Sequence, residues 1–373
     1  MPANTADDIY LSRFGAWDYP LAGMQRMTSR RMGPHANLVA KIRDGESETI
    51  VKVPANVGSR YATRAIQKEF GVLNHLSTFS RAIHIPKPLI LRSKPGDCAA
   101  EYSVCQGVPM NLFMARHISE PVWQHIMDWT CRFLIDLGKS RSNEPPISLA
   151  DPHGAMIERP LSIIATAFPN DAPMIREYVK NILTDDLPYH FVPVHGDFNP
   201  WNMLIVPATT LGELHPYVLD WEDYSDFGLP LFDGFYFMMV CIWILAFGET
   251  KSNNLAQIDI DDLIQRNHLI TKLAKQFCLS YGQEMKLNKH MIDPLFILFL
   301  LRATAEDIRA KRDNPRSAVR WLDILKFQLK ENVFLNAVKL MFLYALRSKG
   351  QLTQNPKLMA DSDAEIKRIL AEH

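Results

Sequence analysis

The sequence has little of several features that mark whole classes of protein. It contains five cysteines, at positions 98, 105, 131, 241 and 278, with no Cys-x-x-Cys pair among them. An odd, scattered set argues against a disulfide framework and favours free thiols in a reducing compartment, so we expect a cytoplasmic location. Neither sign of charge is in excess, with 41 basic and 41 acidic residues. This balance argues against an extended nucleic-acid-binding surface.

Long hydrophobic runs are also missing. The first residues lack a basic region followed by an apolar core, so no signal peptide is expected. The most apolar run, residues 235–247, is too short to span a bilayer and lies between Asp233 and Glu249. We therefore expect buried helices and no membrane span. The 373 residues suffice for one or two globular domains.

The most informative stretch is residues 190–223. Two short apolar runs, 203–206 and 217–219, are typical of strands, and the connection between them contains turn-forming proline and glycine. Polar residues precede the first run and follow the second. A hairpin would therefore bring distant side chains to one end of a small sheet: Asp197, Asn202 and Asp220.

These residue types suit phosphoryl transfer to a hydroxyl group. The reaction needs positioning and charge neutralisation more than covalent chemistry. An aspartate can orient the hydroxyl and accept its proton, while an asparagine and a second aspartate offer oxygen ligands to Mg²⁺. Asp197 and Asn202 have the spacing of the catalytic Asp and metal-binding Asn of protein kinases, and Asp220 follows a hairpin as their second metal ligand does.

A metallohydrolase is the alternative interpretation of this stretch. Its metal ligands would be His195, Asp197, His215 and Asp220. No His-Glu-x-x-His motif or Cys-His spacing favours it.

The motifs resemble one family in particular. His-Gly-Asp at 195–197 and Asp-Trp-Glu at 220–222, with Asn202 between them, resemble the aminoglycoside phosphotransferases and choline kinases. The resemblance covers roughly residues 28–245. It implies an α+β, two-lobed protein-kinase-like fold, with a small N-terminal antiparallel sheet lobe carrying one helix and a larger, mostly helical C-terminal lobe. The implied domains are a nucleotide-binding lobe (1–106), a catalytic and acceptor-binding lobe (107–350) and a tail helix (351–373).

The resemblance also assigns roles in the central stretch. Asp197 would be the catalytic base, and Asn202 and Asp220 would bind Mg²⁺ with Glu222 as an auxiliary ligand. His195 would support the catalytic loop structurally. Asp233, which opens an apolar helix, would hold the same loop, because a carboxylate beside such a helix needs hydrogen bonds; capping that helix is the alternative.

The nucleotide site would lie in the N-terminal lobe. Runs 38–42 and 49–53 around an Asp-Gly turn predict a hairpin, and Lys52 lies on its second strand. By resemblance, Lys52 contacts phosphates and pairs with Glu69 on a helix predicted at 61–79; the alternative is two independent surface charges. The resemblance implies two further nucleotide contacts. Backbone groups of the hinge, Ser103, Val104 and Cys105, would bind adenine. The loop over the phosphates would include Ser29 and Gly33, and it contains fewer glycines than the same loop in the family.

The rest of the chain is predicted to be mainly helical. Residues 1–22 are interpreted as a loosely structured lead-in whose Phe14, Trp17 and Tyr19 pack on the neighbouring strands. Apolar periodicity then predicts helices at 122–137, 174–183, 232–247, 263–281, 291–311, 318–347 and 361–371.

These features together predict an Mg²⁺-dependent phosphotransferase. It would move the γ-phosphate of ATP or GTP to a hydroxyl of a small molecule: a sugar, an amino alcohol, an aminoglycoside or a glycan precursor. A catalytically silent nucleotide- or partner-binding protein is the alternative, which the poor glycine loop keeps open. A polycationic acceptor would need an acidic cleft, and acidic residues that could form one also suit a solvated helix face: Glu222, Asp223, Asp226, Asp259, Asp261, Asp262, Glu306 and Asp307.

Overall fold

The computed structural model describes residues 6–27, 36–79, 84–140, 157–182, 190–206, 210–248, 260–310, 316–331 and 333–371. The chain forms two compact units. The sheet unit contains residues 1–110, 195–197 and 201–224, and the helical unit contains residues 111–194, 198–200 and 225–373. The domain boundaries expected from the sequence, at 106 and 350, remain predictions.

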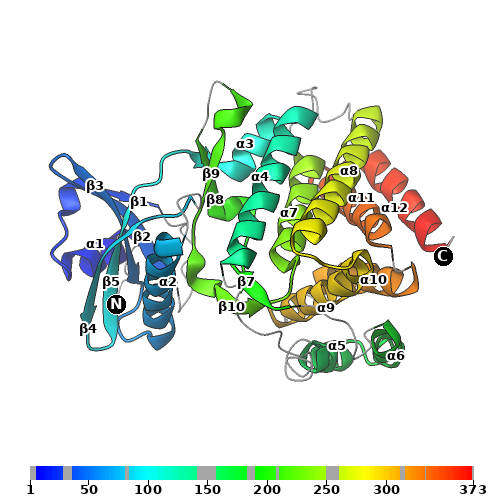
Figure 1. Cartoon of the computed structure of the whole chain (residues 1–373), viewed down its shortest axis with the longest axis horizontal. Helices are drawn as coiled ribbons and strands as arrows, with labels where there is room; N and C mark the ends of the chain where they lie inside the picture. The colour runs from blue at the N-terminus through cyan, green and yellow to red at the C-terminus, as the bar shows by residue number, and fades with distance from the viewer. Residues whose placement is uncertain are drawn as a thin grey trace. The chain divides into compact units, whose positions relative to one another are not determined.

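A five-stranded antiparallel sheet dominates the sheet unit, with the order β1-β2-β3-β5-β4. Helix α2 (Arg60–Phe79) packs against β3 and β5 (Figure 1). The hairpin predicted around Gly45 is confirmed as β2 and β3. The strands are β1 (Met24–Arg26), β2 (Asn37–Asp44), β3 (Ser47–Pro54), β4 (Pro88–Lys94) and β5 (Asp97–Ser103).

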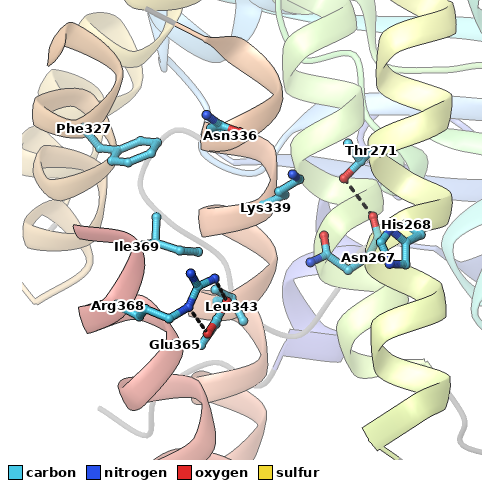
Figure 2. A pocket seen from close by; sticks show the side chains of 10 residues that line it. All are labelled: Asn267, His268, Thr271, Phe327, Asn336, Lys339, Leu343, Glu365, Arg368 and Ile369. Carbon is cyan, nitrogen blue, oxygen red and sulfur yellow. Dashed lines mark hydrogen bonds and ion pairs between the residues drawn. The ribbon is translucent and has the colours of Figure 1, made fainter. Parts of the chain in front are cut away.

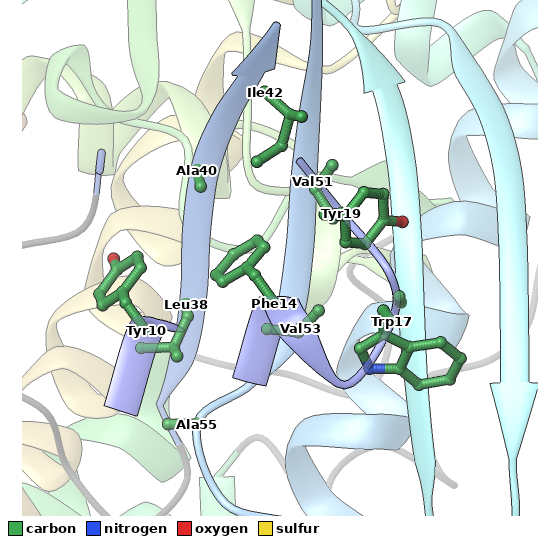
Figure 3. Close-up of a cluster of buried hydrophobic side chains, with 11 residues drawn as sticks. Tyr10, Phe14, Trp17, Tyr19, Leu38, Ala40, Ile42, Val51, Val53 and Ala55 are labelled. Carbon is green, nitrogen blue, oxygen red and sulfur yellow. The ribbon is translucent and has the colours of Figure 1, made fainter. Parts of the chain in front are cut away.

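The N-terminal residues cover a second surface of this sheet. The prediction of a loose lead-in is wrong, because residues Ala6–Gly15 form helix α1. The expected packing of its aromatic residues is confirmed: Phe14, Trp17 and Tyr19 are buried with Val51 and Val53 (Figure 3). Burial of these large side chains supplies the apolar area that a short helix needs to remain folded.

A small second sheet in the sheet unit has the order β6-β8-β9. The predicted hairpin of the central stretch is confirmed, since β8 (Met203–Val206) pairs antiparallel with β9 (His215–Val218). Strand β6 (Val108–Pro109) joins β8 next to Gly107. Gly107 has φ +138°, and a Cβ there would lie 2.7 Å from the carbonyl oxygen of Ile205. Glycine is therefore required where the chain reaches this sheet.

The helical unit is built around α7 (Phe232–Phe247), which is buried over most of its length. The helix predicted at 318–347 is wrong as a single element, because α10 ends at Glu331 and α11 begins at Phe334. The Asp293 carboxylate accepts a hydrogen bond from the Phe334 amide at 2.6 Å and so caps the new start. The tail helix begins at Pro356, earlier than the predicted residue 361.

Within this unit, α7 packs against α4, α8, α9 and α11. The other helices and strands of the unit are α3 (Met110–Arg116), α4 (Glu120–Lys139), α5 (Arg159–Ala167), α6 (Ala172–Ile182), β7 (Val192–Val194), β10 (Ser225–Gly228), α8 (Ile260–Glu284), α9 (Ile292–Ala310), α10 (Arg316–Glu331), α11 (Phe334–Leu352) and α12 (Pro356–Ala371). Within the parts of the chain that the structure describes, no helix is long and apolar enough to cross a membrane.

Candidate active site

Lys52 lies at the centre of the candidate site. Strand alternation on β3 sends Val51 and Val53 into the core beneath α1 and Lys52 toward α2. The Lys52 Nζ atom lies 2.8 and 3.0 Å from the two carboxylate oxygens of Glu69, and 2.8 Å from Oδ1 of Asp220. One ammonium therefore joins the sheet, the helix and the segment after β9.

Glu69 is held as a buried carboxylate with several donors. Its side chain is only 3% exposed, and it also accepts hydrogen bonds from the Trp221 amide at 3.2 Å and the Tyr102 hydroxyl at 3.5 Å. Burial raises the pKa of Glu69, and the Lys52 ammonium opposes that shift. A buried pair with this many partners is costly to break, because removing one charge leaves the other uncompensated.

Asp220 shows the opposite pKa shift. Burial disfavours its charged form, but the Lys52 ammonium outweighs burial and holds the pKa of Asp220 below its usual value. For Lys52, burial disfavours the ammonium, and the two carboxylates nevertheless raise its pKa. Attraction between Lys52 and the carboxylates therefore favours the charged forms of Lys52 and Asp220 and opposes the effect of burial on Glu69. Asp220 also has φ +64°, an uncommon conformation for an aspartate that often accompanies functional sites.

The loop from His195 to Asn202 is fixed by side-chain hydrogen bonds. The His195 ring is fully buried, with Nε2 2.9 Å from the Leu219 carbonyl oxygen and Nδ1 3.3 Å from the Asp197 amide. Nε2 must donate to the carbonyl and Nδ1 must accept from the amide, which defines one neutral tautomer. Burial lowers the pKa of His195 to about 4. The ring thus connects the Asp197 backbone to the residue before Asp220.

Asn202 orients the proposed catalytic carboxylate. Its Nδ2 donates to Oδ2 of Asp197 at 2.6 Å and to the backbone oxygen of Asp197 at 3.0 Å. Both amide hydrogens of Asn202 are thereby directed at Asp197, so the carbonyl oxygen of the same side chain faces elsewhere as an acceptor.

Glu222 is tied to β2 and to α2. Asn37 Nδ2 donates to Oε2 of Glu222 at 3.0 Å, and Lys68 Nζ donates to its backbone oxygen at 2.8 Å. Burial, followed by the neighbouring charge of Asp220, raises the pKa of Glu222 to about 7. Strand β2 starts at Asn37, so this contact links the first residue of the strand to the Asp-Trp-Glu segment.

A pocket of about 250 Å³ opens beside these groups. Lys52, Asp220 and Asn202 form its polar end, and Ser103 and Cys105 lie in its wall. Its apolar walls include Val39 and Ile50 of the five-stranded sheet and Leu204 of β8. Met27, which follows β1, and Leu219, which follows β9, complete them. A largely apolar pocket that ends in a cation and acidic groups suits a nucleotide, with the base against the apolar walls and the phosphates at Lys52.

The structure thus gathers most of the expected residues in one unit. The contacts described above connect seven of them: Lys52, Glu69, Asp197, Asn202, Asp220, Glu222 and His195. Val104 is absent from the pocket wall, which is compatible with a backbone role. Ser29 and Gly33 lie outside the described residues. Asp233 is buried in the helical unit as the second residue of α7, whose N-cap is Leu231, so simple N-capping is not its role. Its support of the loop remains a prediction.

The ligand set of the metallohydrolase does not come together. His215 is exposed and stacks on His84 with ring centroids 5.2 Å apart, and both nitrogens of His195 have partners. Among the described residues, no three His, Cys, Asp or Glu side chains are placed to hold a metal ion. The smaller oxygen-donor set of Asn202 and Asp220 instead fits Mg²⁺, which binds through few protein ligands and shares the phosphates of its nucleotide.

Sequence reasoning missed several residues of this site, among them Trp201 and Asn37. Trp201, next to Asn202, lines the pocket although its side chain is 57% exposed. Asn37 was missed because its partner Glu222 is 185 residues away. A tryptophan directly before the functional Asn202 could have been noticed in the sequence, whereas no sequence pattern marks the Asn37 contact.

Comparison with known proteins gives a family match. A model described as the phosphotransferase enzyme family matches residues 32–257, which is more than half of the 373 residues. A comparison with curated proteins gave no match.

Solved structures of low sequence identity share the fold. A candidate aminoglycoside phosphotransferase from Ralstonia eutropha JMP134 is 15% identical with a TM-score of 0.53, over 88% of this chain and 93% of that chain. Spectinomycin phosphotransferase APH(9)-Ia, in complex with ADP and spectinomycin, is 10% identical with a TM-score of 0.42, over 92% and 94%. Aminoglycoside-3'-phosphotransferase of type VIII is 16% identical with a TM-score of 0.45, over 80% and 99%. The first likeness, together with the antiparallel N-terminal sheet and the helical remainder, confirms the expected protein-kinase-like fold; the other two superpositions are too loose to support an argument.

Proposed function

The chain belongs to the phosphotransferase enzyme family, and on that premise we propose that it transfers the γ-phosphate of ATP or GTP to a hydroxyl group of a small molecule. The observation that carries the proposal is the contact of Lys52 with both Glu69 and Asp220 at the polar end of an apolar pocket. A phosphate-binding cation fixed beside an acidic metal ligand is the arrangement that phosphoryl transfer needs.

Each residue has a defined task in this proposal. Lys52 binds the nucleotide phosphates, and Glu69 holds its ammonium in place. Backbone groups at Ser103–Cys105 bind the base. Asp197, oriented by Asn202, accepts the proton of the acceptor hydroxyl as the phosphoryl group is transferred.

Magnesium is the metal that the donor set suits. The Asn202 side-chain oxygen and the Asp220 carboxylate, with Glu222 as an auxiliary ligand, would hold Mg²⁺, which neutralises phosphate charge. Lys52 contacts only Oδ1 of Asp220. The second carboxylate oxygen is the one we assign to the metal.

The acceptor is proposed as a small molecule with a hydroxyl group, in the range from sugars and amino alcohols to aminoglycosides. The acidic residues considered for a polycation-binding cleft differ in their surroundings. Asp223 is exposed, but Glu306 forms an ion pair with Arg302 at 2.6 Å on the same helix, which is typical of a solvated face. Asp259 lies outside the described residues.

Asp197→Asn tests the function before the acceptor is known. The substitution keeps the size of the side chain and removes its basicity, so slow ATP hydrolysis without acceptor should fall by about 10²–10⁴-fold. Affinity for Mg-ADP should change little, because Lys52, Asp220 and the hinge remain. Single-turnover hydrolysis and calorimetry measure the two quantities.

Equal hydrolysis by the wild type and Asp197→Asn, at matched purity, would show that Asp197 is not the base. If neither protein hydrolyses ATP in the presence of a library of hydroxyl metabolites while both bind Mg-ADP, the silent nucleotide-binding protein becomes the better description.

A further inference from the structure

The helical unit contains a second pocket, of about 290 Å³ (Figure 2). It is lined from α8, α10, α11 and α12, and none of its residues belongs to the candidate active site. Its volume is about ten times the ~30 Å³ that a water molecule occupies in the liquid, so it can hold a small organic molecule.

The charged groups of this pocket favour an anion. Arg368 is paired with Glu365 at 2.5 and 2.8 Å, so these two charges largely cancel. Lys339, from α11, also lines the pocket, and in Figure 2 its side chain points toward Asn267 and Thr271 of α8. The Lys339 side chain is exposed to solvent and has no ion-pair partner among the described residues, so an anionic ligand can contact it without displacing a carboxylate.

The polar and apolar groups of the pocket further restrict the class of ligand that fits it. The side-chain oxygen of Asn267 is buried and has no hydrogen-bond partner among the described residues. An acceptor left in this state is costly, and a small rotation of the carboxamide would let it receive a hydrogen bond from a ligand hydroxyl. Phe327 and Ile369 line another part of the pocket and offer a surface for the carbon face of a compact molecule.

We propose that this pocket binds a small hydroxylated organic anion of the phosphomonoester class, such as a sugar phosphate. The phosphate would contact Lys339, a hydroxyl would donate to Asn267, and the carbon skeleton would lie against the apolar side chains. This site depends on neither the nucleotide pocket nor the proposed phosphotransferase activity.

Calorimetric titration of the full chain tests the proposal with three probes: glycerol 3-phosphate, ribose 5-phosphate and glucose 6-phosphate. At least one should bind with 1:1 stoichiometry, and the matching unphosphorylated alcohol should bind at least tenfold more weakly. Lys339→Gln should weaken that binding by about tenfold or more, because a charge-assisted hydrogen bond is lost. Lys275→Gln, which removes an exposed lysine of α8 outside the pocket lining, should bind as the wild type does.

Two further variants test where the probe binds and which polar group it contacts. Lys52→Ala should retain the binding, which distinguishes this pocket from phosphate binding in the candidate active site. Asn267→Leu should bind more weakly without loss of folding stability, because the Asn267 side chain forms no hydrogen bond with the part of the chain that the structure describes. Saturable binding by none of the three probes, equal affinity in Lys339→Gln, or loss of binding in Lys52→Ala would each overturn the proposal.

Discussion

At the scale of single residues, Gly196 explains why the catalytic loop contains His-Gly-Asp. Its φ is +89°, and a Cβ at this position would lie 2.5 Å from the backbone oxygen of Asp223. Any side chain would therefore push the loop away from the Asp-Trp-Glu segment. The glycine makes possible the close approach that places Asp197 and Asp220 in one site.

Gly196→Ala should destabilise the protein by about 1–3 kcal/mol, because alanine tolerates neither the positive φ nor the contact. Nucleotide affinity should fall as well, since the displaced segment carries Asp220. Gly212→Ala is the matched control: it adds the same methyl group where no atom lies within 4 Å, and should change stability by less than about 0.5 kcal/mol. Denaturant unfolding measures both, and equal effects would contradict this account of the loop.

His195 should make the protein sensitive to acid. Burial lowers the pKa of His195 to about 4, below the value of about 6.5 in an unfolded chain. Between these two pH values, His195 is protonated in the unfolded state and neutral in the folded state. Stability is therefore fully present above pH 6.5 and is lost as the pH falls toward 4, by up to roughly 3 kcal/mol.

His195→Gln removes this titration. The variant should be less stable at pH 7.5, because its amide does not reproduce both hydrogen bonds of the ring, but its stability should decline less between pH 6.5 and 4.5 than that of the wild type. Chemical denaturation at several pH values provides the comparison. Parallel stability profiles would mean that His195 does not dominate the acid response.

At the scale of elements, helix α1 is bound to the sheet by a buried ion pair. Arg13 Nη2 lies 2.7 and 2.8 Å from the carboxylate oxygens of Asp97, and Nε donates to the Pro54 carbonyl at 2.8 Å. Both side chains are at most 10% exposed. The pair connects α1 to β5 and to the end of β3, the strand that carries Lys52.

Arg13→Ala should cost about 3–5 kcal/mol, because it leaves the Asp97 charge buried without its partner. The double variant Arg13→Met with Asp97→Asn should be more stable than Arg13→Ala, since both charges are then gone. Arg43→Ala serves as the control: it breaks the Arg43–Glu48 pair, where the arginine is 66% exposed, and should cost less than about 1 kcal/mol. Similar losses for Arg13→Ala and Arg43→Ala would show that α1 is held by apolar packing alone.

The elements also show what sequence patterns can and cannot reveal. The β2–β3 and β8–β9 hairpins and helix α7 were predictable, because local periodicity and turn residues specify them. Helix α1 was not, because its stability comes from aromatic residues packed against distant strands. The break at Val333 was missed because apolar periodicity continues across it, and the capping carboxylate of Asp293 lies 41 residues away.

In the candidate site too, residues marked by sequence patterns were predictable and residues brought in by tertiary contacts were not. Asp197 and Asn202 were found because they lie five residues apart, and Asp220 was found because it follows a hairpin whose strands the sequence pattern predicts. The choice of Glu69 for Lys52 depended on the resemblance. Asn37 and the apolar walls of the pocket could not be found, because tertiary contacts alone bring Val39 and Leu219 to the same cavity.

At the scale of the whole molecule, nucleotide binding should stabilise the sheet unit more than the helical unit. Every residue that lines the candidate nucleotide pocket belongs to the sheet unit. A ligand that binds only the folded state stabilises it by about 2.7 kcal/mol at one hundred times its dissociation constant. Amide hydrogen exchange reports such stabilisation segment by segment.

Mg-ADP should therefore slow exchange in β3, α2 and the β8–β9 hairpin, with much smaller effects in α8, α11 and α12. Lys52→Ala should abolish the protection, because the phosphate contact and the link between Glu69 and Asp220 disappear together. Lys330→Ala, an exposed position in the helical unit, should preserve it. Mass spectrometry of the full-length protein, with and without a saturating concentration of Mg-ADP, measures the exchange of each segment. Protection confined to α8–α12, or protection that Lys52→Ala leaves unchanged, would place the nucleotide outside the pocket beside Lys52. The chain would then have a kinase-like fold without the nucleotide site that we assign to it.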